Sequence, residues 1–200
     1  MRDRSRCTWC IGCWRRGEAE LATRTCLLNT HGDWETRLRP PFRSKQEVII
    51  DAPLEAVWSF CMDLTKIPEF HPRVSKVDLI DGKAFREPGV SYQCHLSGGK
   101  HTCIEKDIEI VPLQKIVTVL PEDSFGISRI LSDYVVETTF QKLGDASTKV
   151  EISHYYSTAS LKAKLLNLIA KHKIARGTQA TLNAAKTAIE VARTPGVGVL

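Results

Sequence analysis

The sequence predicts an α+β domain with an antiparallel sheet of six or seven strands, two short helices after the first strand and a long C-terminal helix. Between Lys45 and Thr158, short runs rich in β-branched residues follow one another and are separated by turn signals. Only one pair of short helical segments interrupts them, after the first run. From residue 160 to about 193 the apolar spacing changes to three and four residues, which is typical of one long helix.

The segment Glu47–Pro72 contains the first strand and the two short helices. Val48–Ile50 is β-branched and suits a pleated, half-buried surface. Pro53 has no amide hydrogen, so it ends a strand well and fits a first helical position. We expect Asp51 and Asp63 to cap the two helical turns. The residues at helical spacing are Leu54, Val57, Trp58, Cys61, Leu64, Ile67 and Phe70.

The later strands are separated by glycine-containing turns and by no helical pattern, so we expect them to be antiparallel. The expected strands are 74–80, 90–96, 102–111, 115–120, 126–131, 134–143 and 148–158. The long helix is expected to bury a single apolar stripe, made of Leu161, Leu165, Leu168, Ile169, Leu182, Ala185 and Ile189.

The run APLEAVWSFCMDLTKIPEFHP, residues 52–72, resembles the opening of the START-like superfamily, in its polyketide cyclase/dehydrase and lipid-transport branch. That branch begins with a strand, an Ala-Pro, a helix carrying Val-Trp, and an Asp-Leu…Pro-aromatic turn. The resemblance extends in layout from Lys45 to Arg193 and implies a helix-grip fold, in which the curved sheet wraps around the long C-terminal helix. It implies no single activity, because carriers, receptors and enzymes share this scaffold.

Composition favours one domain with an N-terminal extension. The chain has 200 residues, of which 42% are hydrophobic, and no run of about 18 apolar residues that could span a membrane. Before Lys45 there are nine Arg and five acids (9 − 5 = +4), and from Lys45 onward 19 basic residues and 18 acids (19 − 18 = +1). The predicted domain therefore offers no electrostatic case for nucleic acid. We expect an extension at 1–44, a ligand-binding domain at 45–193 and a flexible tail at 194–200.

The extension contains the cysteines Cys7, Cys10 and Cys13 at C-x2-C-x2-C spacing, followed by Cys26 and His31. Thiolates at this spacing can converge on zinc or an iron–sulfur cluster. Zinc sites usually pair two such knuckles, so we favour a disordered or non-native extension and expect no metal and no cofactor. The segment also lacks the apolar core of a secretory signal. We expect a cytoplasmic protein whose later cysteines are reduced.

Strand parity predicts which side chains face the helix, because successive side chains alternate between the faces of a sheet. The inner face would hold three tyrosines and a histidine among aliphatic residues. The predicted ligand-binding residues are Tyr92, Cys94, Tyr134, Thr138, His154 and Tyr156, with Phe70 and His71 at the entrance. In the strand 102–111, the inward set would be Ile104, Ile108 and Ile110, and the same phase turns Lys106 inward.

These residues predict a protein that binds or transports a hydrophobic small molecule or lipid in an internal cavity, without covalent chemistry. The alternative is a cyclase or dehydratase with His154 as the base and Tyr134 as its partner. A third reading is an interaction module acting through the Arg-rich extension. The basic run from Lys162 to Arg176 favours a solvated helix face, with weak contact to an anionic membrane surface as the other reading. The sequence leaves the oligomeric state open.

Overall fold

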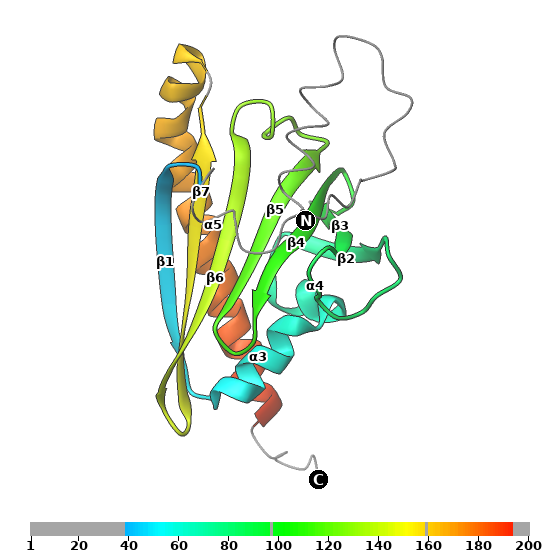
Figure 1. The fold of residues 1–200 in the computed structure, drawn as a ribbon, viewed down its shortest axis with the longest axis vertical. Coiled ribbons are helices and arrows are strands. Elements are labelled where there is room, and N and C mark those ends of the chain that lie inside the picture. Colours follow the sequence, from blue (N-terminus) through cyan, green and yellow to red (C-terminus); the bar gives the residue numbers. More distant parts are fainter. Residues whose placement is uncertain (1–38, 97, 159, 194–200) are drawn as a thin grey trace, which may run out of the picture. The chain divides into compact units, whose positions relative to one another are not determined.

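The protein is described by a computed structural model that covers residues 39–193, apart from residues 97 and 159 and the side chain of Lys162. Within this range the chain forms one antiparallel sheet of seven strands and a long C-terminal helix, as predicted (Figure 1). The elements are β1 (Phe42–Ile50), α3 (Leu54–Met62), η1 (Leu64–Lys66), α4 (Ile67–Phe70), β2 (Val74–Leu79), β3 (Ser91–Leu96), β4 (His101–Val111), β5 (Lys115–Asp123), β6 (Ser132–Gly144), β7 (Ser147–Ser157) and α5 (Leu161–Arg193).

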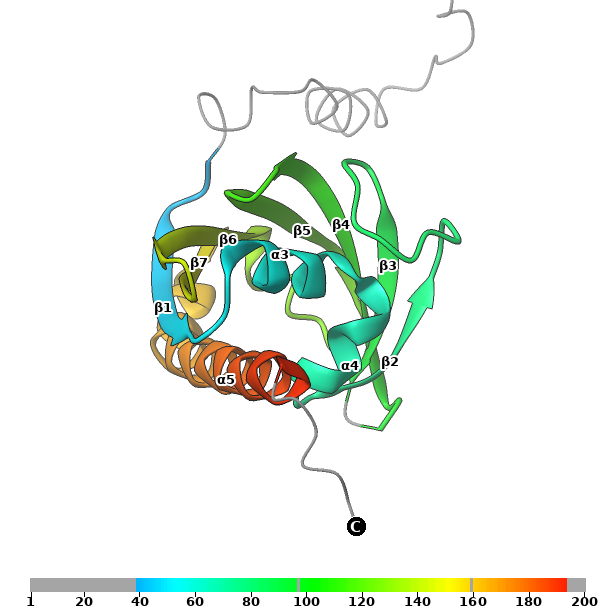
Figure 2. The same cartoon turned by 90° about the horizontal axis from the view of Figure 1, so that it is seen from below.

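The strand order is β1-β7-β6-β5-β4-β3-β2, so the first two strands lie at opposite edges of the sheet. The helical segment between them therefore crosses the width of the sheet. Figure 2 shows the sheet curving around α3, α4 and α5, which all lie on its concave side. No described helix combines the length and the apolar character that a membrane-spanning helix needs.

Two separate hydrophobic clusters fill the two ends of this concave side. One lies where α3 and the second half of α5 meet the sheet, and includes Val57, Phe140 and Leu182. The other lies where η1 and α4 meet β3, and includes Leu64 and Tyr92. The concave side of the sheet therefore carries two separate hydrophobic clusters.

One expected strand, 126–131, and part of the expected inward phase of β4 are wrong. Residues 126–131 form turns instead of a strand, because the carboxylate of Asp123 accepts hydrogen bonds from the amides of Phe125, Ile127 and Ser128 and folds the chain back. In the first part of β4 the inward phase is the opposite of the predicted one, whereas Ile110, beyond the register shift after Asp107, packs against the core cluster as predicted. The register of β4 with β3 places Glu105 opposite the buried Tyr92, whereas Lys106 lies opposite Ser91 on the other face.

The single apolar stripe predicted for α5 is also wrong. Leu182, Ala185 and Ile189, in its second half, are buried. Leu161, Leu165, Leu168 and Ile169, in its first half, are exposed. The helix thus buries apolar residues on one face near its end and presents others to solvent near its start.

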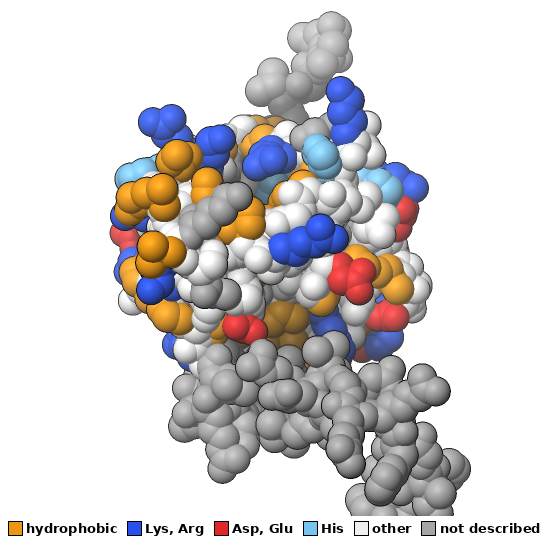
Figure 3. All heavy atoms as spheres, turned by 90° about the horizontal axis from the view of Figure 1, so that it is seen from above, with side chains coloured by type: hydrophobic (Ala, Val, Ile, Leu, Met, Phe, Trp, Pro, Cys, Tyr) orange, Lys and Arg blue, Asp and Glu red, His pale blue; other side chains and the backbone are white. Residues whose placement is uncertain are grey.

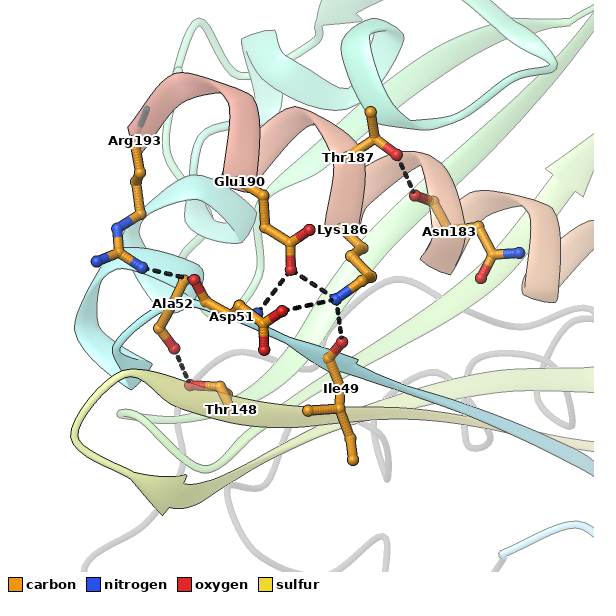
Figure 4. Close-up of polar contacts among 9 residues, drawn as sticks. All are labelled: Ile49, Asp51, Ala52, Thr148, Asn183, Lys186, Thr187, Glu190 and Arg193. Atoms are coloured by element: carbon orange, nitrogen blue, oxygen red, sulfur yellow. Dashed lines mark hydrogen bonds and ion pairs between the residues drawn. The ribbon is translucent and has the colours of Figure 1, made fainter. Parts of the chain in front are cut away.

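The end of α5 is joined to the end of β1 by a cluster of polar contacts (Figure 4). Lys186 Nζ lies 2.6 Å from Glu190 Oε1 and donates to the carbonyl of Ile49 at 2.8 Å. Glu190 Oε1 in turn accepts from the amide of Asp51 at 2.7 Å. Asp51 therefore belongs to this cluster and does not cap α3, which has no side-chain cap. The predicted cap at Asp63 is confirmed, since its carboxylate accepts from the amide of Thr65.

Candidate ligand-binding site

A chain of hydrogen bonds crosses the interior from β6 through β7 to α5. The hydroxyl of Tyr134 lies 3.0 Å from Nδ1 of His154, and Nε2 of His154 lies 2.7 Å from Oγ1 of Thr178. The hydroxyl of Thr178 donates a hydrogen bond to the carbonyl of Ile174 at 3.0 Å. Its oxygen therefore accepts the hydrogen bond from Nε2 of His154. Nδ1 of His154 is then the acceptor for Tyr134. Both ring nitrogens are occupied by protein groups.

Burial sets the charge of this pair. Removal from water lowers the pKa of His154 to about 4, because the imidazolium form is the one that loses solvation. Burial also raises the pKa of Tyr134, and the nearby Tyr156 and Glu105 add to the effect. Near neutral pH both side chains are uncharged. The pair therefore presents a neutral, fixed set of hydrogen-bonding groups rather than a strong base.

Tyr156 extends this group toward the start of α5. Its ring stacks on that of Tyr134, with 5.3 Å between centroids and 6° between planes. Its hydroxyl donates to Oδ1 of Asn167 at 2.6 Å. The structure thus brings three of the predicted residues together, and α5 supplies Asn167 and Thr178 as their partners. Sequence reasoning missed both partners, because a single Asn or Thr in a helix gives no periodic signal.

A second polar group is formed by Arg86, which precedes β3, together with residues of β3, β4 and β5. Nη1 of Arg86 donates to the hydroxyl of Tyr92 at 2.6 Å and to Oδ1 of Asp107 at 2.7 Å. Tyr92 donates in turn to Oε2 of Glu105 at 2.8 Å, and Thr118 donates to Asp107 at 2.7 Å. Burial raises the pKa of Asp107, although Arg86 opposes this. The predicted inward position of Tyr92 is confirmed, and its partners show that this part of the interior is ionic.

Glu105 interacts with both polar groups, the one around Tyr92 and the one around Tyr134 and His154. Its carboxylate bonds to Tyr92 and also contributes to the raised pKa of Tyr134 and to the electrostatic environment of His71. It therefore lies within electrostatic range of both polar groups. Parity reasoning placed Glu105 outside, because it took Ile104 and Ile108 as the inward phase of β4. The directly opposed pair Cys94 and Cys103 fixes the true phase.

Cys94, Cys103 and Glu105 bring two thiols and a carboxylate within 4.8 Å of one another. This donor set suits zinc in kind. The hydrogen bond to Cys103 and burial both raise the pKa of Cys94, however, which disfavours the thiolate that would bind a metal. Oε2 of Glu105 already accepts from Tyr92. We assign no metal to this set.

Phe70 and His71, predicted at the entrance, follow each other at the end of α4. Phe70 packs against the hydrophobic cluster that contains Tyr92 and Cys94. Nδ1 of His71 accepts from the amide of Arg73 at 3.4 Å, and burial lowers the pKa of His71. Beside them, Glu69 of α4 borders a groove of about 540 Å³ whose other wall is the end of α5. The wall residues on α5 are Ala184, Thr187, Ala188, Val191 and Ala192.

The inner face of β6 and β7 is not fully packed. Val136 pairs with His154 across the two strands, and Thr138 pairs with Ile152, so all four side chains face the concave side. Val136, Thr138 and Ile152 are nevertheless only half-buried, as is Tyr134. These inward side chains keep part of their surface accessible to solvent, although Ile152 also packs against the core cluster.

A curved antiparallel sheet around a long helix, with polar groups facing an incompletely packed interior, defines a START-like helix-grip domain. The chain belongs to the family described as "Polyketide cyclase / dehydrase and lipid transport", whose model matches residues 41–190. No curated protein matches the sequence.

Solved structures share the fold at low sequence identity. The Zhui aromatase/cyclase from Streptomyces sp. R1128 is 19% identical, with 78% of this chain and 98% of that chain covered and a TM-score of 0.60. Norcoclaurine synthase of Thalictrum flavum is 16% identical, with coverage of 79% and 100% and a TM-score of 0.61. A START superfamily protein from Mycobacterium smegmatis is 13% identical, with coverage of 76% and 99% and a TM-score of 0.57.

Proposed function

We propose that this domain binds a hydrophobic small molecule or lipid between the sheet and α5, without covalent chemistry. The observation that carries the proposal is the half-buried state of Val136, Thr138 and Ile152 on the inner face of the sheet. An apolar lining with a few fixed polar groups is the usual composition of a small-molecule site. Tyr134 and Glu105 would then orient a polar group of the ligand.

The neutral state of the Tyr134–His154 pair supports binding over catalysis. A general base works best with a pKa near the working pH, whereas burial lowers the pKa of His154 to about 4. Its acceptor nitrogen is also occupied by Tyr134. In this arrangement His154 fixes the orientation of the Tyr134 ring.

The test is native mass spectrometry of the purified full chain, combined with binding of an apolar fluorescent dye such as anilinonaphthalene sulfonate. Thr138→Trp should fill the proposed space and reduce dye binding by tenfold or more. Thr139→Trp is the matched control, since its neighbouring position points to the opposite face and should leave dye binding unchanged. Absence of any apolar ligand and equal dye binding by both variants would refute the proposal.

The second candidate function is a cyclase or dehydratase, and the hydrogen-bonded Tyr134–His154 pair is the observation that favours it. The Tyr134 hydroxyl could donate to the oxygen of an enolate if it turned away from Nδ1 of His154, which accepts its hydrogen bond in this structure. In that case His154→Ala would abolish turnover of a synthetic linear poly-β-ketone, while the affinity of the variant for this compound would stay within a few fold of the wild-type affinity. Equal loss of turnover and affinity would indicate binding. The third reading, through the Arg-rich extension, concerns residues outside the described part.

A further inference from the structure

The first half of α5 exposes large aliphatic side chains. Leu161, Leu165 and Ile169 are 84%, 68% and 61% exposed, and Leu168 lies beside them. Their spacing of three and four residues places them on one side of the helix. We call these four residues the apolar stripe. Figure 3, which views the end of the molecule where α5 begins, shows hydrophobic side chains gathered together with basic side chains around them.

The opposite side of the same helix segment packs on the domain. Ala163 and Thr178 are buried, and Asn167 accepts the hydroxyl proton of Tyr156. Surface helices normally bury their apolar side and expose their polar side. Here small and polar residues face the domain and the aliphatic residues face out. The apolar stripe therefore leaves most of its surface outside the domain's own packing and needs another explanation.

The segment around the stripe is strongly basic. The sequence contains no acid between Ser160 and Glu190. Lys164 and Lys171 lie along one edge of the stripe by helical spacing, and Lys173 lies along the other. None of these three lysines pairs with a carboxylate of the described residues. A partner that binds this surface must therefore present both apolar groups and negative charge.

Two other candidate partners, a second copy of the chain and residues 1–38, lack the required negative charge. A second copy would bring the same basic segment against itself, and like charges oppose such contact. Residues 1–38 contain seven Arg and five acids (7 − 5 = +2), so this part of the chain is also positive. An aliphatic stripe edged by lysines is the pattern of helices that lie in the interface of an anionic membrane.

We propose that the first half of α5 docks on an anionic membrane surface, with the apolar stripe in the interface and the flanking lysines at the lipid phosphates. The proposal rests on the proposed ligand-binding function and deepens it, because the membrane then becomes the place where an apolar ligand is collected or released. The reverse side of the same segment supplies Asn167 and Thr178, which hold Tyr156 and His154. Docking therefore engages the helix whose inner side holds the polar side chains of Tyr156 and His154.

The test is co-sedimentation of the full chain with vesicles of phosphatidylcholine alone or with about a third of phosphatidylserine. We expect binding to the anionic vesicles only, and weaker binding at high salt because exposed charges are screened. Leu165→Glu combined with Ile169→Glu should reduce binding at least tenfold. Ile49→Glu combined with Ile80→Glu is the matched control, since these aliphatic residues are similarly exposed elsewhere and should leave binding unchanged.

Three outcomes would overturn the proposal: no binding to anionic vesicles, equal binding by both double variants, or a dimer in analytical ultracentrifugation that Leu165→Glu and Ile169→Glu dissolve. Dye binding in the same preparations separates this proposal from the proposed function. A Leu165→Glu/Ile169→Glu variant that loses vesicles and keeps the dye supports docking. A wild-type protein that binds anionic vesicles but no apolar dye leaves docking in place and refutes the ligand-binding function.

Discussion

The hydroxyl of Tyr134 and Nδ1 of His154 lie 3.0 Å apart, and this hydrogen bond joins two neighbouring strands inside the domain. Tyr134→Phe removes the donor and leaves a buried ring nitrogen without a partner. We expect a loss of about 1–3 kcal/mol in the free energy of unfolding, measured by urea denaturation. Tyr155→Phe, on the outer face of β7, is the control and should cost less. An unchanged stability for Tyr134→Phe would show that water replaces the hydroxyl.

Acid should destabilise the domain through His154. Its pKa is lowered to about 4 in the folded state from an ordinary value of 6.5, so between these values the unfolded chain binds the proton and the folded domain does not. The contribution of His154 to the free energy of unfolding is therefore fully present above pH 6.5. It decreases as the pH falls from 6.5 toward 4. The full loss is about 3.5 kcal/mol at most, at about 1.4 kcal/mol per pKa unit.

The measurement is urea denaturation across this pH range for the wild type and for His154→Gln. The difference between the two curves isolates His154, because His71 also has a lowered pKa and acts in the same direction. The raised pKa of Asp107 acts in the opposite direction, since its contribution is lost as the pH rises. Parallel curves for the two proteins would contradict the assignment to His154.

Arg86 should be the most sensitive position of the ionic group. Arg86→Met leaves Asp107 buried with its charge uncompensated, and such a change typically costs about 3–5 kcal/mol. Adding Asp107→Leu removes the stranded charge and should recover a large part of that loss. Lys83→Met is the control, because Lys83 and Glu87 form an exposed pair worth about 1 kcal/mol or less. Thermal unfolding of all three variants checks the order.

Leu182 and Leu165 lie on the same helix, but truncation should destabilise the domain strongly at Leu182 and hardly at all at Leu165. Leu182 is 2% exposed and packs in the cluster with Val57 and Phe140, so Leu182→Ala should cost about 2–5 kcal/mol. Leu165→Ala removes an exposed side chain and should change stability by about 0.5 kcal/mol or less. A comparable loss for both variants would mean that the start of α5 is packed after all.

Sequence reasoning succeeded where the backbone is regular. The inward parity of Thr138 and His154 was predictable because β6 and β7 pair without interruption from Val135 to Lys142. In β4 the register shifts twice against β5, between Ile104 and Lys106 and between Asp107 and Glu109. Each shift breaks the alternation on which parity reasoning depends.

The rest of the candidate site was hidden for a different reason. Arg86, Glu105 and Asp107 are charged residues that face the interior, and a search for buried apolar residues passes over them by design. The exposed stripe of α5 was misread because helical spacing shows that apolar residues share a side but not which side faces the domain. Only the packing of Ala163 and Asn167 against the sheet decides that question.

The strand order has a consequence for how the domain is made. Among the described elements β1 leaves the ribosome first, yet its partner is β7, near the end of the domain, and Ala52 accepts a hydrogen bond from Thr148, 96 positions further along the chain. The edge of β1 therefore stays unpaired until nearly the whole domain has been synthesised. Contacts so distant in sequence slow folding and expose strand edges to wrong partners. A nascent chain stopped before β7 should be the form most prone to aggregation.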